Sequence, residues 1–548
     1  MEFQTMNKLE KEALKKSGSD FIRLGFSLFF MIGVLTFSFV SNGGVSNNLF
    51  LAVAALIGAY MAMNIGANDV ANNVGPAVGS KALTLTTAII IAATFEAAGA
   101  LIAGGEVVKT IKKGIIDISA FGGNADPFVW AMMAALLSAA LWLNFATMMR
   151  TPVSTTHSIV GGVMGAGIAA AGFSIVNWTT MGKIVASWVI SPILGAVIAA
   201  AFLFCIKKSI IFKDDKVKAA KAYVPVFVAI MSWAFVTYII LKGFKKVWPQ
   251  VVETLNMLPL ISMQITKKPS FSIALTLGLI AAVIVYAFVY ARVNSKTKSL
   301  ENSKESVNAL FTIPLIFSAA LLSFAHGAND VANAIGPLAA INDAVVSGGV
   351  SSKAPIPLWV MGVGALGIAL GLSLYGPKLI KTVGSEITEL NQIRAFSIAM
   401  AASITVIIAS QLGLPVSSTH IAIGGVFGVG FLREWLNIED DTHTIEDDKL
   451  IIHDEKENQD AYASELKTLE EKAEKTQDDY DRIVALYKLI ANEKKIIKAT
   501  KKDIKRIKKV QYVKRDAIKK IVVAWVVTVP AAAILAGALF FMIKSIMV

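Results

Sequence analysis

Gly66-Ala-Asn-Asp-Val-Ala-Asn72 recurs letter for letter as Gly327-Ala-Asn-Asp-Val-Ala-Asn333. Both copies stand inside apolar stretches that are long enough to enter a membrane. An aspartate and two asparagines at hydrocarbon depth need a partner other than lipid, and a bound ion or solute is the usual one. The duplication therefore predicts two homologous halves that converge on one site.

The composition assigns the chain to the membrane proteins. Of its 548 residues, 55% are hydrophobic and 17% are charged, and the mean hydropathy is +0.62, which is too apolar for an ordinary soluble protein. We therefore predict an all-α polytopic membrane protein with about 11–13 membrane segments of ~20 residues each. The apolar runs lie near 21–41, 50–79, 84–104, 127–149, 152–172, 183–206, 223–242, 271–291, 309–338, 356–376, 394–413, 415–432 and 520–545.

Two further elements are duplicated in the same order. They are Pro152-Val-Ser-Thr-Thr-His157 with Gly161-Gly162, matched by Pro415-Val-Ser-Ser-Thr-His420 with Gly424-Gly425, and Lys183-Ile-Val-Ala-Ser-Trp188, matched by Lys520-Ile-Val-Val-Ala-Trp525. Long repeats in one order are typical of transporters rather than of solenoids. The runs at 152–172 and 415–432 follow their predecessors almost directly, so each is expected to be half of a re-entrant hairpin.

The second copy carries an insertion, because His420 and Trp525 stand much farther apart than His157 and Trp188. It is acidic at its start and basic at its end, and its apolar residues keep a 3-then-4 spacing that predicts a helical hairpin or coiled coil. Those residues are Leu466, Leu469, Ala473, Thr476, Tyr480, Ile483, Tyr487 and Ile490. A solvated insert without chemistry is the preferred interpretation, and a regulatory or partner-docking role is the alternative.

The basic residues of the loops set the orientation. The loop before the first repeat has no Lys or Arg, whereas the loop before the second has several, which predicts inverted-topology repeats with the N-terminus cytoplasmic and the C-terminus external. One loop disagrees, since 242–268 should be external yet contains five Lys. The net charge of +13 is then explained by cytoplasmic loops beside an anionic leaflet, not by nucleic acid.

These features predict six segments. They are an N-terminal tail and extra transmembrane helix (1–49), transport repeat one (50–206), a basic connector with linking transmembrane helices (207–308), the first part of transport repeat two (309–432), a charged cytoplasmic helical insertion (433–515), and a final transmembrane helix that completes repeat two (516–548).

The duplicated motifs carry complementary chemistry. In each Pro-Val-Ser segment the proline suits the first turn of a helix and the hydroxyls suit its cap, so free N–H groups and hydroxyls point one way and attract an anion. The aspartates and asparagines offer oxygens that suit hard monovalent cations or protons.

Glu96 lies in the middle of an apolar span, where a carboxylate is costly to bury. A role in binding a cation or proton is preferred over a structural hydrogen bond. His157 and His420 are interpreted as donors or packing residues behind the ligands.

The duplicated GANDVAN and P-V-S-[ST]-T-H elements resemble those of the inorganic phosphate transporter (PiT) family, over about residues 50–432 and again 515–548. The resemblance implies secondary active import of inorganic phosphate by symport with Na⁺ or H⁺ and alternating access. It assigns phosphate binding to Ser154, Thr155, Thr156, Ser417, Ser418, Thr419, Asn68 and Asn329. It assigns cation binding to Asp69, Asn72, Asp330 and Asn333, and Glu96 also falls in a segment that matches a Glu-bearing segment of the family. Phe396-Ser-Ile-Ala-Met400 departs from the family, because many relatives have an acidic residue there.

Transport of another oxyanion, an anion channel and an enzyme are the alternatives to phosphate transport. A symporter of another small oxyanion, such as sulfate or arsenate, would need the same architecture, whereas an anion channel would need a continuous polar pore face. An enzyme is not expected, because no His-Glu-x-x-His motif and no assignable Ser/His/Asp arrangement occurs. We expect no cofactor, no metal beyond a transported Na⁺, a multi-pass location in the plasma membrane in contact with lipid, and leave a homodimer open.

Overall fold

The computed structural model describes residues 2–45, 48–121, 125–149, 153–244, 247–257, 264–347, 355–386, 390–509 and 515–547. The chain forms two compact units. The first, here called the helical body, comprises Met1–Val429 and Asp516–Val548, and the second, the hairpin unit, comprises Gly430–Arg515. Within the described residues the only β pairing is an isolated bridge between Ile116 and Val176, which confirms the all-α class.

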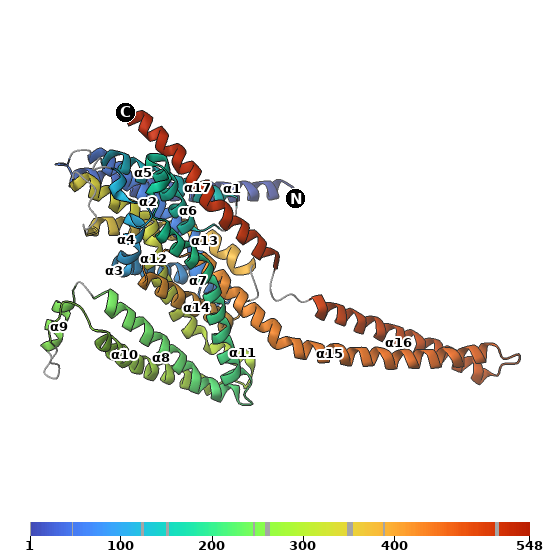
Figure 1. Ribbon diagram of the computed structural model, residues 1–548. Coiled ribbons are helices and arrows are strands. Elements are labelled where there is room, and N and C mark those ends of the chain that lie inside the picture. Colours follow the sequence, from blue (N-terminus) through green and yellow to red (C-terminus); the bar gives the residue numbers. More distant parts are fainter. Residues whose placement is uncertain are drawn as a thin grey trace. The chain divides into compact units, whose positions relative to one another are not determined.

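The helices of the body follow one another along the chain with short connections (Figure 1). They are α1 (Glu2–Ser41), α2 (Asn48–Gly79), α3 (Leu85–Ala103), α4 (Gly105–Lys113), α5 (Ala125–Met148), α6 (Thr155–Ala171), α7 (Trp178–Ile206), α8 (Lys216–Lys242), α9 (Trp248–Asn256), α10 (Phe271–Thr297), α11 (Lys304–Leu310), α12 (Thr312–Ser347), α13 (Leu358–Glu386), α14 (Gln392–Gln411), the start of α15 (Ser418–Glu470) and α17 (Arg515–Met547). Three short helical turns, η1 (Ile118–Phe121), η2 (Phe173–Ile175) and η3 (Lys207–Ile211), lie between them.

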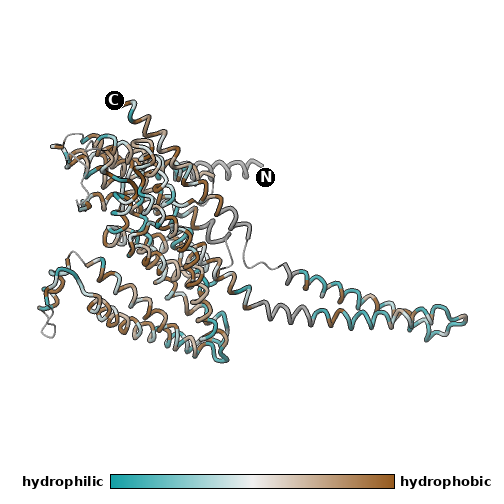
Figure 2. The backbone as a smooth tube through the Cα atoms, in the orientation of Figure 1, coloured by the Kyte–Doolittle hydropathy of each residue, from teal (hydrophilic) through white to brown (hydrophobic). Residues whose placement is uncertain are grey.

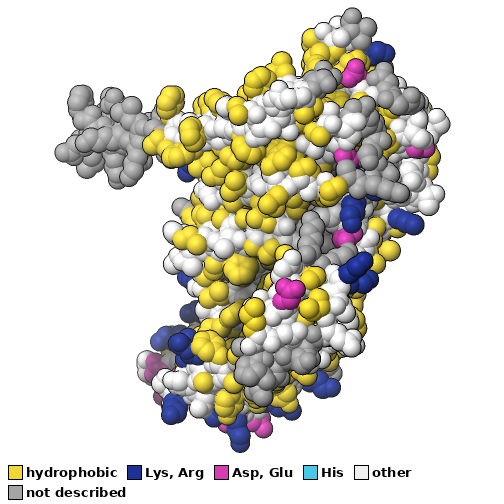
Figure 3. Space-filling model, turned by 90° about the vertical axis from the view of Figure 1, so that its left-hand side faces the viewer, with side chains coloured by type: hydrophobic (Ala, Val, Ile, Leu, Met, Phe, Trp, Pro, Cys, Tyr) yellow, Lys and Arg dark blue, Asp and Glu magenta, His cyan; other side chains and the backbone are white. Residues whose placement is uncertain are grey.

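Eleven helices of the described residues are long and apolar enough to cross a membrane. The predicted run at 152–172 is not among them, because α6 has only 17 residues. The run at 415–432 is not among them either, and there α15 begins at Ser418. A re-entrant arrangement of these two segments stays a prediction. Figure 3 shows hydrophobic side chains spread over the face in view, with Lys and Arg side chains around its lower edge and along its right-hand side.

The two helices that carry the GANDVAN motifs form the centre of the body. In the most apolar 18-residue stretch of α12, 89% of the residues are buried. The corresponding share is 67% in α2 and 17% in α1. The motif glycines explain the close packing, because a Cβ on Gly66 would collide with the carbonyl of Ile368 and one on Gly327 with that of Glu96. Neighbouring backbones therefore touch these helices at the motif itself.

The cap helices α6 and α15 pack against helices of the opposite repeat. A Cβ on Gly161 would meet the backbone of Val529 in α17, and one on Gly424 would collide with the backbone of Pro192 in α7. Each repeat thus provides the surface on which the cap helix of the other repeat rests. Pro152, at the start of the first predicted cap segment, lies outside the described residues.

The hairpin unit pairs the later part of α15 with α16 (Gln477–Lys509), and its described residues are mostly hydrophilic (Figure 2). Arg482 Nε and Nη2 donate to the two carboxylate oxygens of Glu465 at 2.7 and 2.9 Å. This hydrogen bond lowers the pKa of Glu465 and raises that of Arg482. The bidentate geometry fixes the pairing of the two helices.

The predicted seam of the hairpin is right at Leu466, Leu469, Ile483 and Ile490, which are buried or half-buried, and wrong at the other four residues. Ala473 and Thr476 lie in the turn between the helices, and Tyr480 and Tyr487 are 54% and 56% exposed. Leu486, which the spacing did not select, is fully buried instead. The 3-then-4 spacing fails at the turn, because a helical periodicity applies only within one continuous helix.

Candidate functional site

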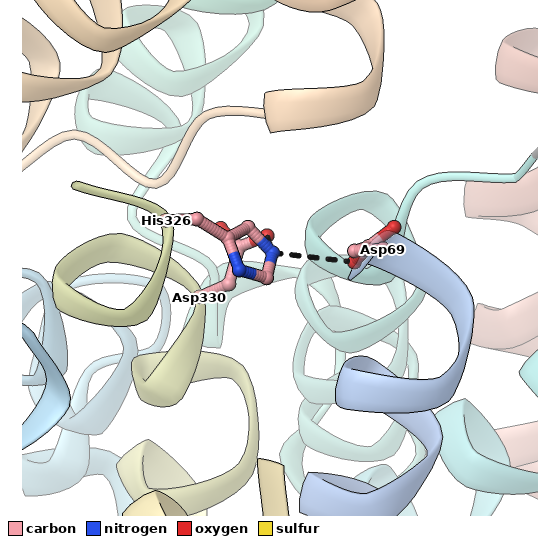
Figure 4. A group of neighbouring side chains, drawn as sticks. All are labelled: Asp69, His326 and Asp330. Atoms are coloured by element: carbon pink, nitrogen blue, oxygen red, sulfur yellow. Dashed lines mark ion pairs between the residues drawn. The ribbon is translucent and has the colours of Figure 1, made fainter. Parts of the chain in front are cut away.

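The motif carboxylates face one another across the centre of the body. Asp69 projects from α2 toward His326 and Asp330 of α12 (Figure 4), and both aspartates are 1% exposed. His326 Nε2 lies 2.9 Å from Asp330 Oδ2 and 3.7 Å from Asp69 Oδ2. One ligand atom from each of these three residues lies within 4.8 Å of the others, which is close enough to surround a single cation.

Glu96 of α3 joins this group from the other side of His326. Its Oε2 lies 3.1 Å from His326 Nδ1, and its Oε1 accepts a hydrogen bond of 2.7 Å from Asn73. Glu96 and His326 are both 0% exposed. A carboxylate at this depth is therefore matched by a basic ring and an amide donor, as the cost of its burial requires.

His326 is the member of this buried cluster that the sequence did not lead us to predict. It directly precedes the second GANDVAN motif, where the first copy has Ile65. A basic residue inside an apolar span, at a position where the repeat is otherwise strict, was the available signal.

Both Pro-Val-Ser segments form the helix caps that the sequence predicted. Ser154 Oγ accepts a hydrogen bond of 3.2 Å from the backbone N–H of His157, and Ser417 Oγ accepts one of 3.3 Å from that of His420. Ser154 has an extended backbone before α6 begins at Thr155, as a capping residue should. The free N–H groups of both first turns lie beside the hydroxyls.

The hydroxyls of both caps reach the motif carboxylates. Thr155 donates to Asp69 Oδ2 at 3.2 Å, and Thr419, from the other repeat, donates to Asp69 Oδ1 at 3.1 Å. Ser418 donates to Asp330 Oδ2 at 3.1 Å. The anion-binding and cation-binding sets predicted from the sequence are thus in direct contact.

The second asparagine of each motif crosses to the cap of the opposite repeat. Asn72 Nδ2 donates to Thr419 Oγ1 at 2.9 Å, and Asn333 Nδ2 donates to Thr156 Oγ1 at 3.1 Å and Thr155 Oγ1 at 3.3 Å. Among the described residues, Asp330 Oδ1 and Asn333 Oδ1 are buried oxygens without a hydrogen-bond donor. These oxygens are available to a ligand.

The first asparagine of each motif holds the segment that precedes a cap. Asn68 Nδ2 donates to Asp69 Oδ1 at 3.0 Å and to the carbonyl of Val153 at 3.4 Å. Asn329 Nδ2 donates to Ser410 Oγ, and its Oδ1 accepts from the N–H of Val416 at 3.3 Å. Their contact with phosphate stays a prediction.

Comparison with known proteins decides the family. A family model described as "Phosphate transporter family" matches residues 65–536. The chain belongs to the phosphate transporter family. Membership confirms the resemblance that the motifs indicated, and the match includes both GANDVAN motifs, both caps and α7.

Individual relatives of this phosphate transporter family member match over most of its length. Two Helicobacter pylori proteins, of strains J99 and 26695, are each 49% identical over 99% of this chain and 98% of their own, and both are named "Putative phosphate permease". A Thermococcus kodakarensis protein named "Putative phosphate permease TK2061" is 38% identical over 70% of this chain and 89% of its own. A solved structure, "The sodium-dependent phosphate transporter", has a TM-score of 0.69 at 30% identity and covers 91% of this chain and 99% of its own.

Proposed function

We propose that the protein imports inorganic phosphate by symport with a cation, Na⁺ or H⁺, through alternating access. The single observation that carries the proposal is the double contact of Asp69, whose carboxylate receives Thr155 from one cap and Thr419 from the other. Hydroxyls that bind an anion and a carboxylate that binds a cation therefore share one buried site, which is the arrangement that coupling requires.

The charge of the site supports coupling to a cation. Three buried carboxyl groups, those of Asp69, Glu96 and Asp330, surround one histidine, so the acidic groups of the site outnumber this basic group. A phosphate anion would be repelled from such a site unless cations entered with it. Na⁺ is the first candidate, because the matching solved structure is named a sodium-dependent transporter.

The cross-contacts between repeats support alternating access. Asn72 bonds to the cap of repeat two and Asn333 to the cap of repeat one, so the site lies on the boundary between the halves. A rocking motion of one half against the other would open such a boundary to either side. We keep the inverted topology, the cytoplasmic N-terminus and insertion, the external C-terminus and the plasma-membrane location as parts of the proposal.

The residue roles follow from this arrangement. Phosphate is assigned to the hydroxyls and first-turn N–H groups of both caps, with Asn68 and Asn329 behind them. The cation is assigned to Asp69, Asn72, Asp330, Asn333 and Glu96, and His326 joins this set because it lies beside all three carboxylates.

Uptake of radiolabelled phosphate into proteoliposomes, with inward Na⁺ and pH gradients imposed separately, tests the proposal. We expect the gradient of the coupling cation to drive phosphate above its equilibrium level, with excess sulfate competing weakly. Equal uptake without either gradient would indicate a passive channel. Stronger inhibition by unlabelled sulfate than by unlabelled phosphate would favour the other oxyanion.

A further inference from the structure

Four aromatic rings lie in a continuous row behind the two caps. His157 stacks on Trp188 with ring centroids 3.7 Å apart, and His420 packs on Trp525 at 3.9 Å. The two histidine rings meet edge to face at 4.8 Å. The row, here called the ring ladder, joins α7, α6, α15 and α17, and therefore crosses from one repeat to the other.

Each histidine of the ladder directly follows a cap hydroxyl. His157 comes after Thr156, and His420 comes after Thr419. Because consecutive residues of a first helical turn move together, the position of each ring fixes the position of the hydroxyl beside it. Trp188 makes a second contact between the two repeats, because its Nε1 donates to the carbonyl of Pro415 at 3.1 Å.

Stacking, not hydrogen bonding, holds the two imidazoles. They are 2% and 1% exposed, yet His157 Nδ1 and both ring nitrogens of His420 have no hydrogen-bond partner in the described part of the chain. No described Asp or Glu forms an ion pair with either ring, in contrast to His326 with its three carboxylates. These rings therefore make their contacts through their aromatic faces, which pack on Trp188 and Trp525.

We propose that the ring ladder sets the distance between the two hydroxyl caps, and that His157 and His420 are positioning residues for Thr156 and Thr419. The inference rests on the proposed phosphate transport. Loss of either histidine ring breaks the row that positions both caps. The two histidines therefore act as one unit. A ring without nitrogen should serve as well as imidazole.

The test compares alanine and phenylalanine at both positions in full-length protein, with the KM and maximal rate of phosphate uptake measured in proteoliposomes. An aromatic contact of this kind corresponds to a change of about two- to tenfold in affinity. We expect His157→Ala and His420→Ala each to raise the KM for phosphate by about that factor, with the cation dependence of uptake unchanged. The His→Phe variants should stay within about twofold of wild type.

The double variant distinguishes one ladder from two separate stacks. Removing both rings should raise the KM by less than the product of the single effects, because each single change already breaks the same row. If the alanine variants fail to insert, His157→Leu and His420→Leu fill the space without a ring and give the same comparison. Tyr286→Ala removes a different aromatic stack, that with Tyr290 in α10, and serves as the matched control.

Three results would overturn the inference: phenylalanine variants as impaired as alanine variants, single effects that multiply, or an unchanged KM in all variants. Absence of phosphate uptake by the wild-type protein would instead refute the proposed function. The two failures are therefore distinguishable in one set of measurements.

Discussion

His326 Nδ1 lies 3.1 Å from Glu96 Oε2, and this contact joins two residues that the repeat does not duplicate. Ile65 stands where His326 would have its counterpart. In α13, which follows α12 as α3 follows α2, no Asp or Glu occurs from Leu358 to Pro377. The two repeats therefore contribute different chemical groups to the site. Glu96 is a buried acid that only repeat one supplies, and His326 is a buried base that only repeat two supplies.

We expect Glu96→Gln and His326→Gln each to reduce phosphate uptake by more than tenfold, because either change removes one member of a buried ion pair and leaves the other member with fewer partners in a desolvated site. The double variant should be less impaired than the product of the two single effects. Initial uptake rates in proteoliposomes measure all three. Independent, multiplying effects would show that the pair does not act together.

Asp69→Asn and Asp330→Asn should weaken cation coupling, because each removes a full charge from the buried site. The loss should be larger for Asp69, whose carboxylate accepts from both caps, than for Asp330, which accepts from Ser418 alone among the cap hydroxyls. Phosphate uptake as a function of cation concentration measures this. Normal cation activation in both variants would exclude the assigned role.

Lys112 Nζ and Asp343 Oδ2 form a buried ion pair at 2.7 Å between α4 and the end of α12. Asp343→Asn should lower stability by about 1.5–3 kcal/mol, because the buried ammonium group loses its charged hydrogen bond to this carboxylate. Thermal unfolding in detergent reports the change as a lower melting temperature. The exchanged pair Lys112→Asp with Asp343→Lys should recover part of the loss, and no recovery would mean that other contacts of these positions dominate.

The hairpin unit contains a pH-sensitive contact. Glu493 is 7% exposed, and its hydrogen bond with Glu455 raises its pKa above the ordinary value of 4.5. The folded hairpin therefore binds this proton more tightly than an unfolded one, so its stability should fall as the pH rises from 4.5 through the raised pKa.

Glu493→Gln should remove this pH dependence. Spin labels on cysteines at the exposed positions Lys456 and Lys494, in a Cys205→Ser background, report the fraction of paired helices by the distance between them. An equal pH response in the glutamine variant would refute the assignment to Glu493.

Deleting the stretch from about Glu439 to Val510, with a short linker between the ends, should leave measurable phosphate uptake. The stretch lies within the hairpin unit, whereas the carboxylates and caps belong to the helical body. Uptake by a variant shown to insert in the membrane is the measurement. Complete loss in such a variant would mean that the insertion takes part in transport.

Hydropathy and the duplicated motifs were enough to predict the helical class, the positions of most spans and the caps at Ser154 and Ser417, because each depends on local sequence. The separation into an anion set and a cation set did not anticipate the direct bonds between Asp69 and both caps. Those bonds depend on how α6 and α15 approach α2. Lys112 and Asp343 were missed for the same reason, since a pair that is distant in sequence has no local pattern.

The packing of α6 against α17 sets the order in which the molecule can be completed. The backbone that Gly161 touches, that of Val529, belongs to α17, which follows the insertion in the chain. The surface that covers the glycine face of the first cap helix is therefore synthesised only after the insertion. A product that ends within the insertion would contain every motif of the first repeat and still lack the surface against which its cap helix packs.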